Sequence, residues 1–160
     1  MEKILIILSG STNSGKTQTL NKLICKLQDE YPLAKTKDSN GKELKFETQI
    51  IEGDRLVIFD SINEKKIGIN TAGDNSKQVI ESIDLFDNND CDIVVCATKV
   101  ISNSDNGSVS TMQKKIPSLI KDTKVIPLFK ILHKGENQQT LDDNDDYMVK
   151  VILDQLNRFI

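Results

Sequence analysis

Long hydrophobic runs are missing from this sequence of 160 residues. No apolar stretch approaches the roughly 20 residues that a membrane-spanning helix needs, and the N-terminus shows no signal-peptide pattern. An excess of positive charge is also missing, because the net charge is −3 and the pI is near 5.2. A general nucleic-acid-binding surface would be expected to show a basic face. We therefore expect a cytoplasmic protein that neither enters the membrane nor has such a surface.

Residues suited to redox or metal chemistry are scarce. The three cysteines, Cys25, Cys91 and Cys96, are odd in number and lack C-x-x-C spacing. Because each lies in an apolar segment, we expect buried, reduced thiols in preference to a redox or metal site. The single histidine, His133, has no fixed partner in the sequence and is expected at the surface or in a loop.

What is present is the composition of a globular protein, with 38% hydrophobic and 28% charged residues. The length suits a single domain over residues 1–160 with one sizeable core. No internal repeat and no interdomain linker interrupts the sequence. One α/β domain is the expected class.

The most specific pattern lies near the N-terminus. An apolar run, Ile4–Leu8, is followed by a segment that fits G-x-x-x-x-G-K-[ST] at every fixed position. In such a loop inward-turned main-chain N–H groups hold a polyphosphate, and glycines allow the close backbone approach. The lysine reaches the β- and γ-phosphates, and the hydroxyl that follows it binds Mg²⁺. The candidate phosphate-binding residues are Gly10, Ser11, Thr12, Asn13, Ser14, Gly15, Lys16 and Thr17.

The segments around this motif fit its usual context. Apolar residues at positions 20, 23, 24, 27 and 31 have helical spacing, and Pro32 then ends the predicted helix. With strand, loop and helix in this order, residues 4–31 resemble the P-loop NTPases. The resemblance implies a three-layer α/β fold, with helices on both faces of a mainly parallel sheet, that binds ATP or GTP with Mg²⁺.

The remaining patterns predict further strands and helices. Strands are expected at 44–50, 56–59, 67–69, 91–97 and 125–132. Gly53 and Asp54 turn the chain before the second of these, and the second and third form an antiparallel hairpin. Helices are expected from about Ser76, over 110–120 and over 148–159, the last preceded by the acidic residues 142–146. Pro127 is expected to place the last strand at a sheet edge or to end its regular pairing.

Two polar segments, 35–41 and 102–108, have the composition of exposed loops. We expect them to act as switch-like loops that contact a protein partner.

A carboxylate for Mg²⁺ is expected at the end of a strand beside the phosphate-loop strand. Asp60 and Asp74 compete for this role, because the two arms of an antiparallel hairpin end at opposite edges. If the second arm runs parallel to the first strand, its end brings Asp74 to the phosphate side. We therefore favour Asp74, which can also cap a helix. Thr98 and Lys99, after the 91–97 strand, are candidates for sensing the γ-phosphate.

The order of phosphate loop, hairpin and Asn-Thr-Ala-Gly at residues 70–73 resembles the Ras-like small GTPases, whose second switch begins with Asp-Thr-Ala-Gly. Here Asn70 takes the place of the aspartate. The guanine motif of that family, Asn-Lys-x-Asp, is not supplied by residues 98–101 or by any later segment. ATP is therefore preferred over GTP.

Three functions follow. The first is an Mg²⁺-dependent NTPase in which Lys16 and Asp74 are catalytic. The second is a small nucleotide or nucleoside kinase; the presence of only two arginines, Arg55 and Arg158, argues against it, although Lys99, Lys114 and Lys115 could replace them. The third is a nucleotide-binding regulatory module with little hydrolysis, which Asn70 and the absence of an evident general base favour.

Overall fold

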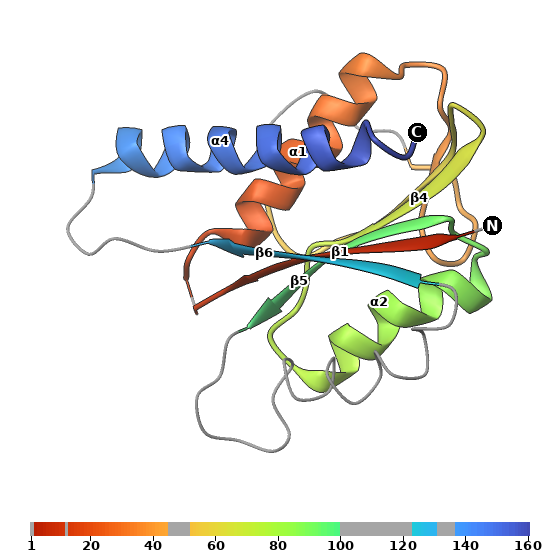
Figure 1. The fold of residues 1–160 in the computed structure, drawn as a ribbon, viewed down its shortest axis with the longest axis horizontal. Helices are drawn as coiled ribbons and strands as arrows, with labels where there is room; N and C mark the ends of the chain where they lie inside the picture. Colours follow the sequence, from red (N-terminus) through yellow and green to blue (C-terminus); the bar gives the residue numbers. More distant parts are fainter. Residues whose placement is uncertain (1, 12, 45–51, 100–122, 131–136) are drawn as a thin grey trace.

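The computed structural model describes residues 2–11, 13–44, 52–99, 123–130 and 137–160. They form a six-stranded sheet in the order β2-β3-β4-β5-β1-β6, with helices on both faces (Figure 1). The strands are β1 (Lys3–Gly10), β2 (Thr36–Lys37), β3 (Leu56–Ile62), β4 (Lys65–Asn70), β5 (Ile93–Lys99) and β6 (Thr123–Lys130). The helices are α1 (Lys16–Glu30), α2 (Ser76–Asn88) and α4 (Gln138–Leu156).

The sheet is mixed, and its parallel part contains the central strands. β4, β5, β1 and β6 pair in parallel, whereas β3 is antiparallel to β4 and β2 is antiparallel to β3. This confirms the predicted α/β class and the antiparallel hairpin. In the register of the sheet, Gly10 lies opposite Lys99 on one side and Lys130 on the other. The carboxyl ends of three strands therefore meet where the phosphate-binding motif begins.

The continuous apolar run of β1 is explained by burial on both faces. Ile4, Ile6 and Leu8 pack with α1 and α4 on one face, and Leu5 and Ile7 pack with α2 on the other. Figure 1 shows α1 and α4 together on one face of the sheet and α2 on the opposite face.

Local sequence signals set several boundaries as predicted. α1 ends at Glu30, before Pro32, and α2 begins at Ser76. The cap itself differs from the expectation, because Asn75 and not Asp74 caps α2 and forms a capping box with Gln78. β6, which contains Pro127, is an edge strand of the described sheet.

Two expectations were wrong in part. α4 begins at Gln138, because the Asn137 side chain accepts a hydrogen bond from Thr140 N at 3.0 Å and caps the helix there. The acidic residues 142–146 therefore lie inside the helix and not ahead of it. Within the expected loop 35–41, Thr36 and Lys37 form β2 and pair with Phe59 and Ile58 of β3.

Some predicted features lie outside the described residues: strand residues 45–50, loop 102–108, helix 110–120 with Lys114 and Lys115, His133, and Thr12 of the motif. Among the described helices, none is both long and apolar enough to cross a bilayer.

Candidate phosphate-binding site

The loop between β1 and α1 turns sharply around two glycines. Gly15 immediately precedes α1 with φ of 77°, in the left-handed region, and Asn13 has φ of 60°. A Cβ on Gly10 would lie 2.9 Å from the Lys130 main-chain oxygen and 2.5 Å from Ser14 Oγ, so the backbone path favours glycine at both positions of the motif. The N-terminus of α1 has no side-chain cap among the described residues, and a helix start carries N–H groups that lack intrahelical acceptors.

Lys16 folds back over this loop. Its Nζ donates to the main-chain oxygens of Ser11 at 2.8 Å and Gly10 at 3.2 Å, and the residue is only 6% exposed. Burial lowers the pKa of the Lys16 ammonium; Asp74 acts in the opposite direction and Lys99 adds to the decrease. Both charged candidates at this edge are therefore electrostatic neighbours of Lys16.

Thr17 lies next to a carboxylate that the sequence did not single out. Its Oγ1 is 3.3 Å from Asp54 Oδ1 and 3.3 Å from the Thr71 main-chain oxygen. From the sequence, we expected Asp54 only to be a turn residue. Thirty-seven residues separate Asp54 from Thr17, and only the pairing of β3 with β4 brings its segment to the motif, so no local pattern could have found it.

The turn that carries Asp74 reaches the site by crossing the end of β5. We expected the metal-side carboxylate on a strand beside β1, but β5 lies between β4 and β1. Gly73 makes the crossing possible, since a Cβ there would lie 2.0 Å from the Ala97 main-chain oxygen. Lys99 N donates to Gly73 O at 3.0 Å and holds the turn against the strand end.

Asp60 lies toward the strand ends that are opposite to the loop. β3 runs antiparallel to β4, and Asp60 forms ion pairs with Lys37 and, at 3.8 Å, with Lys66. The hydrogen bond from Lys37 lowers the pKa of the Asp60 carboxyl. The choice between Asp60 and Asp74 thus rests on strand direction, as the sequence argument supposed.

The Asn70 side-chain amide makes three hydrogen bonds, and these explain why asparagine occupies this position. Its Nδ2 donates to Gln78 O at 3.1 Å and to Ser82 Oγ at 3.0 Å, while its Oδ1 accepts from Ala72 N at 3.1 Å. A carboxylate cannot donate to the Gln78 carbonyl. Asn70 is 2% exposed and faces α2.

The two residues at the end of β5 differ in position. Thr98 is buried, and its Oγ1 lies 2.8 Å from Ser9 Oγ, so the two hydroxyls share one hydrogen bond across the β1–β5 pair. Lys99 is half-buried at the strand end and is a charge neighbour of Lys16. Of the two, Lys99 is better placed to meet an anion on the loop.

No family model, curated protein or solved structure matches this chain. The groups present at the site indicate which ligands it can bind. The loop offers main-chain N–H groups and one ammonium, which suit a polyanion. The Thr17 hydroxyl, the Thr71 carbonyl and the Asp54 carboxylate are hard oxygen ligands of the kind that Mg²⁺ accepts. Within the described residues no cluster of three or more His, Cys, Asp or Glu could hold a metal alone.

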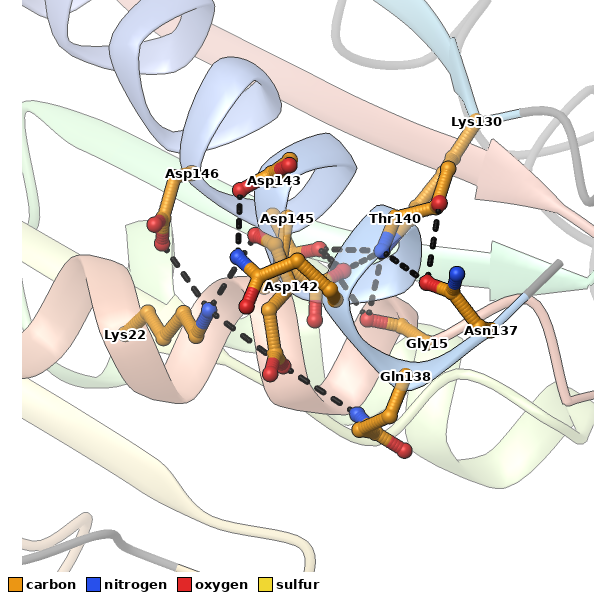
Figure 2. Close-up of polar contacts among 12 residues, drawn as sticks. Gly15, Lys22, Lys130, Asn137, Gln138, Thr140, Asp142, Asp143, Asp145 and Asp146 are labelled. Carbon is orange, nitrogen blue, oxygen red and sulfur yellow. Dashed lines mark hydrogen bonds and ion pairs between the residues drawn. The ribbon is translucent and has the colours of Figure 1, made fainter.

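A buried ion pair between Lys130 and Asp145, which the sequence did not indicate, contacts the residue that precedes α1 (Figure 2). Lys130 Nζ, at the end of β6, donates to Thr19 Oγ1 at 2.7 Å, to Gly15 O at 3.1 Å and to the Asp145 carboxylate of α4. Burial, with Lys22 and Lys16 adding to it, lowers the pKa of the Lys130 ammonium to about 8. The pair ties the first turn of α1 to α4.

Proposed function

We propose that the chain is a P-loop protein that binds a nucleoside triphosphate with Mg²⁺, and that it acts as an ATPase. The observation that carries the proposal is the position of Lys16, whose ammonium lies on the carbonyls of Gly10 and Ser11 at the start of α1. An ammonium held there, above a left-handed Gly15, can exchange these carbonyls for phosphate oxygens.

The residues have separate tasks in this proposal. Main-chain N–H groups of residues 13–17 and the Lys16 ammonium bind the β- and γ-phosphates. Thr17 binds Mg²⁺, with Asp74 as the carboxylate that the sequence favours, and Lys99 contacts the γ-phosphate. The cation, when bound, neutralises charge that develops on the transferred phosphoryl group.

The preference for ATP rests on the missing guanine motif, and the alternatives are weighed by the site. A kinase needs an acceptor pocket beside Lys16. A groove of about 990 Å³ lies between α1 and α4, but neither Lys16 nor Thr17 lines it. The regulatory module gains support from Asn70, because its amide is fully used by Gln78, Ser82 and Ala72.

The test of nucleotide binding is Lys16→Ala. We expect the Kd for MgATP, measured by calorimetry, to rise at least about tenfold, which corresponds to about 1.4 kcal/mol, because the ammonium that lies on the Gly10 and Ser11 carbonyls is removed. Lys26→Ala is the matched control, since Lys26 is on the same helix but pairs with Glu30 in solvent. An equal Kd for wild type and Lys16→Ala would contradict the proposal.

Turnover separates the three functions. Release of inorganic phosphate from MgATP supports the ATPase, and label transferred to a nucleoside or nucleotide supports the kinase. Tight binding with neither product supports the regulatory module.

A further inference from the structure

We propose that Asp54, in the segment before β3, supplies the protein carboxylate to the divalent cation that Thr17 binds. The inference rests on the proposed nucleotide site and deepens it, because it assigns a cation ligand that neither the motif nor the strand pattern indicated. Asp74 then serves as the charge neighbour of Lys16.

Two acceptor oxygens lie beside the Thr17 hydroxyl. Asp54 Oδ1 and Thr71 O both lie 3.3 Å from Thr17 Oγ1. One hydroxyl proton cannot serve two acceptors well, and 3.3 Å is long for an O–H···O hydrogen bond. Two acceptor oxygens from separate segments thus lie beside one hydroxyl that has a single proton. A cation bound to the Thr17 hydroxyl would be a partner for both oxygens, and all three groups are ligand types that Mg²⁺ accepts.

The main chain on both sides of Asp54 is held in place by hydrogen bonds. Arg55 N donates to Thr71 Oγ1 at 2.7 Å, and Thr71 N donates to Arg55 O at 2.8 Å. On the other side Asn21 Nδ2, from the second turn of α1, donates to Gly53 O at 3.1 Å. These contacts fix the main chain on either side of Asp54 to the turn after β4 and to the helix that carries Thr17.

Among the described residues, Asp54 and not Asp60 or Asp74 has its carboxylate in hydrogen-bond range of Thr17. Asp60 is ion-paired toward the strand ends that are opposite to the loop. Asp74 begins the approach to α2, where its N–H donates to Gln78 Oε1 at 2.8 Å, and its charge acts on Lys16.

The test measures how much Mg²⁺ strengthens binding of ADP to the full chain. The Kd for ADP is measured by calorimetry in EDTA and in excess Mg²⁺, for wild type, Asp54→Asn, Asp74→Asn and Asp60→Asn. We expect Asp54→Asn to lose about tenfold or more of the Mg²⁺ effect, the range seen when groups that support a metal are removed. Its Kd in EDTA should stay within about threefold of wild type, because the phosphate-binding groups are intact.

A second readout follows binding of the cation itself. Mn²⁺ replaces Mg²⁺, and its binding to the ADP complex is followed by electron paramagnetic resonance; Asp54→Asn should weaken Mn²⁺ binding while Asp60→Asn leaves it unchanged. An unaltered Mg²⁺ effect in Asp54→Asn, or a larger loss in Asp74→Asn, overturns the assignment of Asp54 alone. If wild type binds no ADP in either buffer, the proposed nucleotide site itself fails and this inference fails with it.

Discussion

At the scale of single residues, the most demanding feature is the buried ion pair of Lys130 and Asp145. Both residues are nearly inaccessible, with 5% and 3% exposure. Their charges are stabilised by each other, by Thr19 and by the Gly15 carbonyl. Removing two charges from water costs several kcal/mol per ion, so such a pair adds little net stability but is costly to break.

This difference gives a prediction. Lys130→Met leaves the Asp145 carboxylate buried without its cation and should destabilise the fold by about 3–5 kcal/mol. The double variant Lys130→Met/Asp145→Leu removes both charges and should recover most of that loss. Urea denaturation of the two variants and of Asp145→Leu measures the coupling. If the two single losses simply add in the double variant, the two charges do not depend on each other as described.

At the scale of elements, the turn between β4 and α2 decides how the site is assembled. β5 separates β4 from β1, so residues 71–74 must cross the end of β5 to approach Lys16. The crossing leaves no space for a side chain at Gly73, whose Cβ would meet main-chain atoms of Ala97 that cannot rotate away.

Gly73→Ala should therefore displace the whole turn. We expect a destabilisation of about 3 kcal/mol, the upper end for overpacking, together with weaker binding of MgATP because Thr71 and Asp74 move. Gly68→Ala, in β4 itself, is the matched control. Its Cβ would first meet Leu85 Cδ1, at 2.9 Å, which is the end of a side chain that can shift. Thermal melts and calorimetry on both variants check this; comparable nucleotide affinity in both would contradict the role given to the turn.

The same elements show what the sequence could and could not predict. The buried β1, the end of α1 before Pro32, the start of α2 at Ser76 and the edge position of Pro127 follow from local rules, because each depends on residues a few positions apart. The order of β4, β5 and β1 does not, since parallel pairing joins strands that are far apart in the chain. The contacts of Asp54 with Thr17 and of Lys130 with Asp145 depend on that order and on the packing of α4, so no spacing in the sequence could indicate them.

At the scale of the whole molecule, the sheet separates two apolar clusters. Cys25, on α1, is partly buried against the cluster under α1 and α4, whereas Cys91 and Cys96 are buried in the cluster under α2. Burial raises the pKa of both Cys91 and Cys96 to about 12. At pH 8 both thiols are then almost entirely protonated in the folded state. The three thiols can therefore report on the two faces separately.

We expect iodoacetamide at pH 8 to modify Cys25 first, although burial, aided by Asp29, raises its pKa as well. Cys96 should react only through unfolding of the whole sheet, because β5 is an inner strand whose exposure requires loss of both neighbours. We expect the same of Cys91, which is buried just before β5. MgATP at about 100 times its Kd stabilises the folded state by about 2.7 kcal/mol, and should slow labelling of these two thiols about a hundredfold. Mass spectrometry of the alkylated peptides gives each rate, and Lys16→Ala, for which we expect weak nucleotide binding, should show little protection. Labelling of Cys91 and Cys96 that is independent of MgATP in wild type would mean that β5 and α2 open locally, without unfolding the phosphate-binding loop.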